Sequence, residues 1–418
     1  MATPQDAGPV ELGDLDSRHF VDVELCSESL RQNALKGVMA DWATRQPFYA
    51  YKSGLPVLVC ARARDVREVY NDPRRFTVEA PPYDAYKVFD IFGGLENVLQ
   101  MDGERHDRIR RLMAPAFSPA AVHQLEGAID AIIREKLDRI EASGPGFDAM
   151  ADFSRDIIVR VLLDASFHLT PEQQNVFARM HDNISLATQF RSGEPLPEDF
   201  LNSVMEVRRV IMEIVDQRRA EPGDDMISRL VTARDEGSRL TDEELFGQIN
   251  AICAAGLGST AASLGAALLT LLRHRDQWQL LKREPERVDA AIEECLRFHG
   301  PGIHVFTRFA VGDTVLGGTP VPGNIPVIAA MQAASYDPEE YDDPLRFDIT
   351  RNPRNILTFG GGPHFCIGNR LARLIMKRAL LAMIKSFPDL QLADPFYEPE
   401  YGGFPGELCL KSLPLRTH

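Results

Sequence analysis

An uncharged run of 22 residues, 251–272, is the feature that most constrains this chain. A capping box, Thr241-x-x-Glu244, precedes the run, so the pattern predicts one helix from there to about Arg273. At 1.5 Å per residue such a helix is roughly 50 Å long, enough to cross a bilayer or a large domain. The run is mostly Ala, Gly, Ser and Thr, and two amide side chains stand just before it. We therefore predict a buried helix that crosses a domain, and no membrane span.

The middle of this helix combines small residues with hydroxyls. Gly256 and Gly258 are followed by Ser259 and Thr260. Each glycine costs a helix about 1 kcal/mol relative to alanine, so its presence here indicates a compensating role. A helix that spans a domain and is smooth at its middle favours a flat object packed against it. The two hydroxyls then become candidate functional groups.

The composition is that of an ordinary globular protein. The 418 residues are 44% apolar and 26% charged, and the formal net charge of −15 disfavours non-specific binding to nucleic acid. Six scattered cysteines form no C-x-x-C pair, which suits a reducing cytoplasm. The first residues lack the charged and apolar regions of a signal peptide. We predict a loose N-terminal leader, 1–25, and a single domain, 26–418, that is monomeric.

Periodicity along the chain predicts a mainly α fold with a minor β part. Two apolar runs around a Lys-Ser-Gly turn, within 47–61, indicate a β-hairpin. Residues 80–100, rich in Pro, Gly and aromatics, predict an irregular loop, and the polar stretch 191–200 predicts a loop between two helices. After residue 300, short apolar runs alternate with Gly/Pro turns and predict small strands.

The strongest chemical signal is a glycine-rich turn at 359–373, FGGGPHFCIGNRLAR. It places Cys366 at the start of a predicted helix, where backbone N–H groups lower the pKa of a thiol and hydrogen-bond a thiolate. Glycines at 360–362 and 368 would let the backbone approach a bulky planar partner. A lone cysteine cannot form a structural zinc site. On these residues alone, a nucleophilic cysteine with His364 as base and a buried structural cysteine both stay open.

Four residues of this turn fill the pattern F-x-x-G-x-x-x-C-x-G: Phe359, Gly362, Cys366 and Gly368. The pattern resembles the heme-thiolate loop of the cytochrome P-450 monooxygenases, and the resemblance extends over about residues 40–415. It implies the triangular, mainly α fold of that family around one heme b. It also implies that the Cys366 thiolate is the proximal iron ligand and that Phe359 lies beside the cofactor.

Further matches follow the order of the same family. Glu294 and Arg297 resemble its E-x-x-R pair, and Arg346 resembles the arginine that completes a structural triad. The heme propionates require cationic and N–H donors. The resemblance implies that these donors are His106, Arg110, Arg308 and His364.

The distal-helix pattern of the family, (A/G)-G-x-(D/E)-T, relays protons through an acid and an alcohol. Aligned with residues 255–259, it has Gly258 in place of the acid and Ser259 as the alcohol, followed by Thr260, while Gly256 would leave room for oxygen. Protons must then come from water held by these hydroxyls, from the substrate or from a residue elsewhere. Four activities stay open: an O2-dependent monooxygenase, a peroxide-driven enzyme, a non-hydroxylating reaction such as oxidative coupling or nitric oxide reduction, and a heme sensor.

The resemblance also implies a small-to-medium, largely apolar substrate. The residues expected to line its pocket are Phe89, Phe92, Leu186, Leu257, Val305, Phe306 and Phe404, with His304 or Arg191 at a polar end. Electrons are expected from a separate ferredoxin and its reductase. A basic patch would complement that acidic partner. The candidate residues for this patch are Arg105, Arg108, Arg111, Arg370, Arg373 and Lys377.

Overall fold

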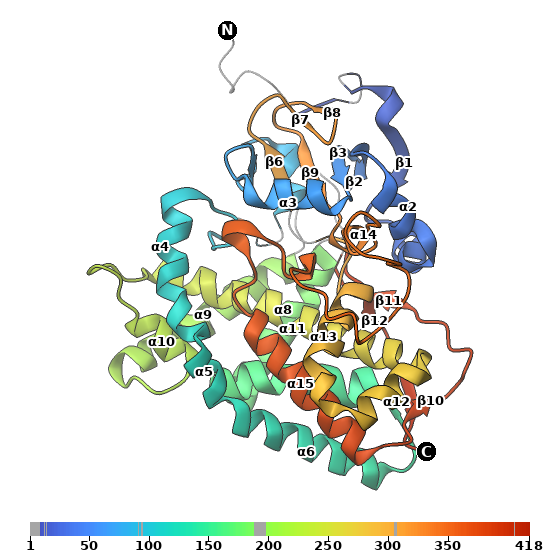
Figure 1. The fold of residues 1–418 in the computed structure, drawn as a ribbon. Helices are drawn as coiled ribbons and strands as arrows, with labels where there is room; N and C mark the ends of the chain where they lie inside the picture. The colour runs from blue at the N-terminus through green and yellow to red at the C-terminus, as the bar shows by residue number, and fades with distance from the viewer. Residues whose placement is uncertain are drawn as a thin grey trace.

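Helix α11 (Asp242–Arg273) crosses the middle of the protein, as predicted (Figure 1). Thr241 caps its start: the Glu244 N–H donates to Thr241 Oγ1 at 3.2 Å, and Glu244 Oε2 accepts from the Thr241 N–H at 2.9 Å. The helix is long and apolar enough to cross a membrane, but 67% of its most apolar stretch is buried inside the protein. The prediction of a buried domain helix is confirmed.

Most of the helices lie around α11. The structure, a computed structural model, describes residues 9–11, 13, 15–90, 92, 95–187, 198–304, 307–404 and 406–418. Besides α11, its α-helices are α1 (Glu28–Asn33), α2 (Met39–Thr44), α3 (Ala63–Asn71), α4 (Gly103–Met113), α5 (Pro119–Gln124), α6 (Glu126–Ser143), α7 (Arg155–Val159), α8 (Pro171–Ala187), α9 (Glu198–Ala220), α10 (Met226–Thr232), α12 (Arg275–Arg283), α13 (Val288–Phe298), α14 (Met331–Ala334) and α15 (Asn369–Ser386). The short 3-10 and π turns are η2 (Ser17–His19), η3 (Ala34–Val38), η4 (Asp84–Phe89), η5 (Ala114–Phe117), η6 (Ala149–Ser154), η7 (Arg160–Ser166), η8 (Pro285–Arg287), η9 (Leu357–Phe359) and η10 (Gly362–His364). The predicted loop at 191–200 lies outside the described residues up to 197.

The β part is small. In the part of the chain that the structure describes, the main sheet has the order β1-β2-β3-β9-β6-β4, and three small sheets have the orders β10-β13-β5, β7-β8 and β11-β12. The strands are β1 (Phe20–Glu24), β2 (Phe48–Lys52), β3 (Leu55–Cys60), β4 (Phe76–Thr77), β5 (Gly146–Asp148), β6 (Arg308–Ala310), β7 (Thr314–Leu316), β8 (Thr319–Val321), β9 (Pro326–Ala329), β10 (Gln391–Leu392), β11 (Tyr401–Gly402), β12 (Cys409–Leu410) and β13 (Pro414–Arg416). The mainly α fold with a minor β part is confirmed.

Two N-terminal predictions have different outcomes. The predicted hairpin is β2–β3, antiparallel from Phe48 opposite Val59 to Lys52 opposite Leu55. The leader predicted as loose up to residue 25 is not loose throughout, because β1 pairs with β2 in parallel. The partly buried apolar side chains of this strand pack on the core. Pairing in the sheet therefore gives residues 20–24 a lower free energy than exposure to solvent would.

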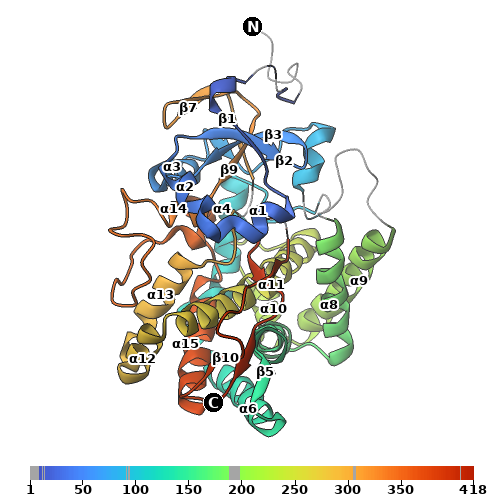
Figure 2. The same cartoon turned by 90° about the vertical axis from the view of Figure 1, so that its right-hand side faces the viewer.

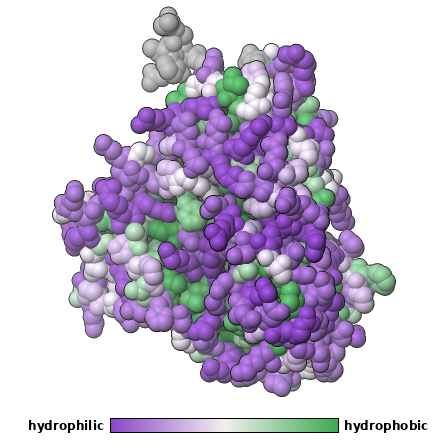
Figure 3. All heavy atoms as spheres, in the orientation of Figure 1, coloured by the Kyte–Doolittle hydropathy of each residue, from purple (hydrophilic) through white to green (hydrophobic). Residues whose placement is uncertain are grey.

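The sheet and the helices occupy different ends of the molecule. The main sheet lies near the N-terminus with α3 against it, and α11, α13 and α15 belong to the helical body at the other end (Figure 1). In the view turned by 90°, α8 and α9 stand together on the side of the body opposite α12 and α13 (Figure 2). The face of Figure 3 carries mostly hydrophilic side chains with small hydrophobic patches between them.

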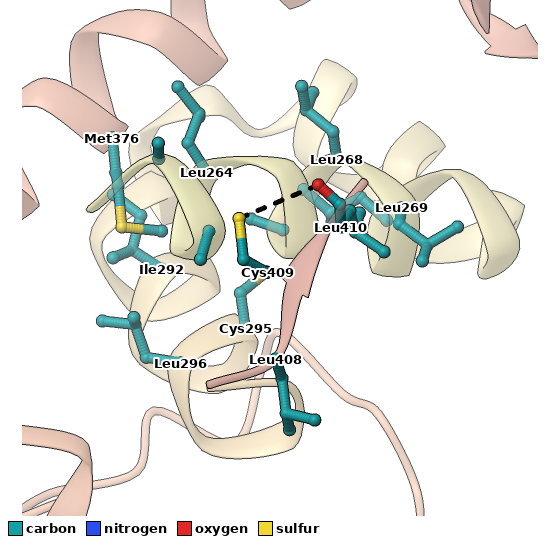
Figure 4. Packing of buried hydrophobic residues seen from close by; sticks show 14 of the residues in the cluster. Leu264, Leu268, Leu269, Ile292, Cys295, Leu296, Met376, Leu408, Cys409 and Leu410 are labelled. Carbon is teal, nitrogen blue, oxygen red and sulfur yellow. Dashed lines mark hydrogen bonds between the residues drawn. The ribbon is translucent and has the colours of Figure 1, made fainter. Parts of the chain in front are cut away.

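The C-terminal half of α11 is packed on several sides. Figure 4 shows Leu264 and Leu268 of this helix among Cys295 of α13, Met376 of α15 and Cys409 of β12. Each of these five side chains is at most 9% exposed. Their burial stabilises the fold by roughly 25 cal/mol per Å² of apolar surface removed from water. This packing fixes α11 relative to α15, the helix that follows the Cys366 turn.

A buried ion pair connects α13 with the coil that leads to the Cys366 turn. The Arg297 Nε and Nη2 atoms donate to the Glu294 carboxylate at 2.8 Å, and both side chains are fully buried. Arg297 also donates to the carbonyls of Ser335 and Pro344, at 2.9 Å and 2.8 Å. The pair therefore holds two points of the coil as well as its own helix.

The third arginine of this network is Arg351, and the prediction of Arg346 was wrong. Arg351 Nε lies 3.4 Å from Glu294 Oε1, and its side chain is 16% exposed. The Arg346 side chain is 65% exposed and lies near Asp348 at the surface. The reason is register: Phe347 is buried in the core, so the preceding side chain turns outward, and Arg346 contributes its carbonyl oxygen to Arg297 at 3.2 Å.

Replacing each of these arginines separately tests the assignment. Arg351→Met leaves Glu294 without one buried partner, so we expect the free energy of unfolding of the holoenzyme to fall by about 2–3 kcal/mol. Arg346→Met removes an exposed pair and should cost less than about 1 kcal/mol. Urea denaturation followed by circular dichroism measures both losses, and equal losses would contradict the assignment.

Candidate active site

The Cys366 turn is closed by its own backbone and packed on α3. The Cys366 N–H donates to the Phe359 carbonyl at 3.0 Å, and α15 begins at Asn369. Gly362 has φ +61°, and a Cβ there would lie 2.1 Å from the Tyr70 carbonyl oxygen. We expected this glycine to let a planar partner approach, but the space beside it is taken by α3. Glycine at position 362 allows the backbone of the turn to pack directly against α3.

The surroundings of the Cys366 sulfur act on its pKa in both directions, and burial outweighs the opposing contributions. The thiol remains accessible, but the protein atoms around it remove bulk solvent and raise its pKa. Two kinds of group oppose this rise and act to lower the pKa: the N–H groups of Gly368 and Asn369, and the charges of Arg110 and Arg373. The predicted N–H donors at the start of the helix are therefore present. A group that neutralises a thiolate, such as a metal ion, would complete this arrangement.

Three of the four predicted propionate contacts come together on the other side of the turn. The rings of His106, on α4, and His364 lie 4.4 Å apart between centroids. Arg308, at the start of β6, is 4% exposed, and its guanidinium lies near the Tyr70 ring. Burial lowers the pKa of Arg308 and of His364. The fourth, Arg110, donates to the carbonyl of Phe365, the residue between His364 and Cys366.

Two of these residues carry a buried side-chain nitrogen without a partner. Arg308 Nε is a donor, whereas His106 Nε2 is a donor only when the ring is an imidazolium, because His106 Nδ1 already lies 2.9 Å from Asp107 Oδ1. In the described part of the chain, neither Nε2 of His106 nor Nε of Arg308 has a hydrogen-bond partner. A buried donor left unpaired costs roughly 1–3 kcal/mol. Carboxylates of a ligand beside the Cys366 turn would accept from Arg308, and from His106 in its protonated form. The residues present thus fit a heme that Cys366 would ligate and whose propionates His106 and Arg308 would hold.

Asp102 belongs to this cluster, although the sequence reasoning did not select it. Its Oδ1 lies 2.8 Å from His364 Nε2, and its Oδ2 accepts from Thr77 Oγ1 at 2.7 Å and from the Val78 N–H at 2.8 Å. Burial raises the pKa of Asp102, but these three hydrogen bonds outweigh it and lower the pKa to about 2. Its place directly before α4 was the available signal, since aspartate there is typical of a helix cap. Here the carboxylate orients His364 instead.

The middle of α11 is its accessible part. Residues 245–254 and 261–272 are buried, whereas Ala255 is exposed and residues 258–260 are partly so. Ser259 Oγ donates to the Ala255 carbonyl at 2.7 Å. The room at Gly256 is predicted to be left for oxygen; a Cβ there would also lie 3.2 Å from Leu162 Cδ2 of η7, a tight contact that this side chain would have to relieve by shifting.

The predicted pocket residues fall into three groups. Leu257 and Phe92 are buried in one apolar cluster, and Phe404 packs against it. Phe89 lies elsewhere, with its ring 5.8 Å from that of Phe309. The remaining predicted pocket residues lie where the structure describes no side chains: Leu186, Val305 and Phe306, together with Arg191. His304 is buried.

Comparison with known proteins decides the family. The family description "Cytochrome P450" matches residues 31–393. The chain belongs to the cytochrome P-450 family. Its fold is the P-450 fold, its cofactor is heme b, and it is an oxidoreductase of the monooxygenase type. When bound, heme b supplies the iron at which P-450 enzymes carry out O2 chemistry.

P-450 relatives from several bacteria cover most of the chain. The 6-deoxyerythronolide B hydroxylase of Saccharopolyspora erythraea is 32% identical over 77% of this chain and 79% of its own length. The nocardicin C N-oxygenase of Nocardia uniformis is 32% identical over 80% of this chain and 83% of its own length. The structure of P-450 PksS of the Bacillus subtilis bacillaene polyketide synthase superposes with a TM-score of 0.83, at 27% identity, over 94% of this chain and 99% of that one. The names of these relatives point to different substrates.

The pKa of Asp102 gives a pH-dependent prediction. Its folded-state pKa of about 2 is below the ordinary 3.8, so its stabilisation is complete above 3.8 and is lost as the pH falls toward about 2. Allowing for partial solvent screening, we expect Asp102→Asn to lower the free energy of unfolding by roughly 1–2 kcal/mol at neutral pH. Urea denaturation from neutral to acidic pH should show this difference shrinking below 3.8. The exposed Asp138→Asn is the control, and a difference independent of pH would contradict the assignment.

Proposed function

We propose that this P-450 inserts one oxygen atom from O2 into a small-to-medium, largely apolar substrate in the cytoplasm. In this proposal Cys366 ligates the heme iron, and His106, Arg110, Arg308 and His364 surround the propionates. The observation that carries it is the cysteine turn, whose N–H groups act to lower the Cys366 pKa, beside two buried nitrogens, His106 Nε2 and Arg308 Nε, that have no hydrogen-bond partner among the described residues. Phe359 supports the turn through its carbonyl, and its ring lies under the Arg373 guanidinium.

Replacing the cysteine tests this ligation. Reduced holoenzyme treated with carbon monoxide should show the Soret band of thiolate-ligated heme, and Cys366→Ser should lose both this band and turnover because it removes the thiolate. Cys26→Ser, at a partly buried cysteine on a different segment, is the matched control and should retain both. A thiolate-type band in Cys366→Ser would contradict the proposal.

Because position 258 is glycine and not an acid, this proposal assigns proton delivery to water that is bound by Ser259. The Ser259 hydroxyl donates its proton to the Ala255 carbonyl. The Ser259 oxygen can therefore only accept a hydrogen bond from a molecule at the accessible middle of α11. A water held there would be oriented with its second proton directed away from Ser259. Thr260, also partly accessible, would be a further contact for such water.

Electron delivery by a ferredoxin and its reductase is part of this proposal, but strong charge attraction does not support it. Five of the six residues of the expected basic patch make ion pairs, with Glu96, Glu244, Asp235, Glu293 and Asp289 as their partners. The patch is therefore largely neutral. The exposed Arg370 and the 39% exposed Phe365 leave a docking surface beside Cys366 that is more apolar than expected.

A peroxide-driven reaction is the second candidate, favoured by the absence of an acid at Gly258. Peroxide brings its own protons, so the two reactions depend differently on Ser259. We expect Ser259→Ala to lower the product formed per NAD(P)H consumed roughly tenfold in reductase-driven turnover, and peroxide-driven turnover only about twofold. Thr260→Ala should have a smaller effect. Equal loss under both conditions would show that Ser259 shapes the site and does not deliver protons.

A further inference from the structure

Lys52 carries a partly buried ammonium group that forms no ion pair with a described residue, although the Glu24 carboxylate is near enough to raise its pKa by charge. Of the eight lysines in the chain, six form ion pairs, including the buried Lys136, whose Nζ lies 2.6 Å from Asp156. Lys385 has no ion pair with a described residue but is exposed. Lys52 has none either, yet it is only partly accessible, and burial lowers its pKa. An ammonium desolvated in this way is costly unless an anion compensates it.

The neighbouring carboxylate is occupied elsewhere. Glu24 Oε1 accepts from the N–H groups of Cys26 and Ser53, at 3.0 Å and 2.9 Å, and Oε2 accepts from the Gly54 N–H at 3.0 Å. Glu24 therefore holds the β2–β3 turn, and no ion pair joins it to Lys52 in the described part of the chain. The fold leaves this ammonium available to a ligand.

Lys52 contacts two residues outside its own hairpin. Its Nζ donates to Thr307 Oγ1 at 3.1 Å and lies 5.4 Å from the centroid of the Phe89 ring. Phe89 is a predicted pocket residue, and Thr307 directly precedes β6. Because the Thr307 oxygen accepts from Lys52, its own proton remains to be donated. Two donors, one of them charged, thus meet at one point.

This point adjoins a groove whose walls combine apolar side chains with carboxylates, Gln100 and Arg105. Phe89 and Thr307 line a cavity of about 400 Å³ together with Val78, Leu95, Leu99 and Phe309. The carboxylates on its lining are engaged: Glu96 pairs with Arg105, Asp90 accepts from Gln100, and Glu79 accepts from the Asp102 N–H. A groove with apolar side chains beside a cation suits a molecule with an apolar body and one anionic end.

We propose that Lys52 and Thr307 bind the carboxylate of the substrate, so that the substrate class is apolar carboxylic acids. This assignment rests on the proposed oxygenation and deepens it by naming the polar end. Lys52 positions the substrate and takes no part in the chemistry. The sequence analysis assigns the polar end of the pocket to His304 or Arg191, and Lys52 is not among its candidates.

Paired ligands test the charge requirement directly. Decanoic acid and phenylacetic acid, each beside its primary amide, are titrated into ferric holoenzyme, with dissociation constants from the Soret shift and from equilibrium dialysis. We expect at least one acid to bind about tenfold more tightly than its amide, the difference that a charged hydrogen bond provides. Failure of both acids to exceed their amides would overturn the proposal.

Variants of Lys52 separate an anchoring role from a structural one. Lys52→Met should remove the acid preference and leave amide binding within about twofold, while Lys52→Arg should retain the preference. Heme content and thermal stability of Lys52→Met should not fall, because an uncompensated charge is removed. Lys385→Met is the control. Unchanged acid binding by Lys52→Met would overturn the proposal. Failure of oxygenation alone would not, because dialysis reports binding without turnover.

Discussion

The buried Glu294–Arg297 pair is the interaction on which the rest of the structure depends. Two fully buried charges persist only when nearly every donor and acceptor is used, and here both groups are satisfied by each other, by coil carbonyls and by Arg351. Such a network contributes less to stability than to a unique arrangement of the chain. It fixes the coil through residue 351, and the Cys366 turn follows only a few residues later. The position of the cysteine is thus set from α13.

The second constraint is that α11 must be buried at both ends and open in the middle. Packing of the kind shown in Figure 4 accounts for the C-terminal end, and the segment 95–100 covers the N-terminal half, where Gln248 accepts from the Val98 N–H. A Cβ at Gly247 would lie 2.1 Å from the Glu96 carbonyl oxygen. The close approach of this segment to α11 therefore requires glycine at position 247. Small residues of α11 therefore allow close packing at Gly247 and leave the middle of the helix accessible to small molecules.

Sequence patterns predicted what depends on short spacing and missed what depends on the register of distant segments. The capping box, the hairpin and the helix after Cys366 follow from residues a few positions apart, and all were predicted. The sequence predicted Arg346 in place of Arg351, because the direction of a coil side chain depends on which of its neighbours is buried. Here the buried neighbour is Phe347. Asp102 and Lys52 acquire their meaning only from partners more than 200 residues away, His364 and Thr307.

One physical criterion connects the cofactor side with the substrate side. In the part of the chain that the structure describes, His106 and Arg308 hold buried nitrogens without hydrogen-bond partners, and Lys52 holds a partly buried cation without an ion pair. An anion would stabilise Arg308 and Lys52, and His106 when its ring is protonated. Satisfying both sites requires two different anionic groups, the propionates and one substrate carboxylate. A carboxylate held by Lys52 and Thr307 stays ionised and is occupied as an acceptor. In this proposal the substrate carboxylate does not serve as the acid missing at Gly258, so water at Ser259 or a residue elsewhere delivers the protons.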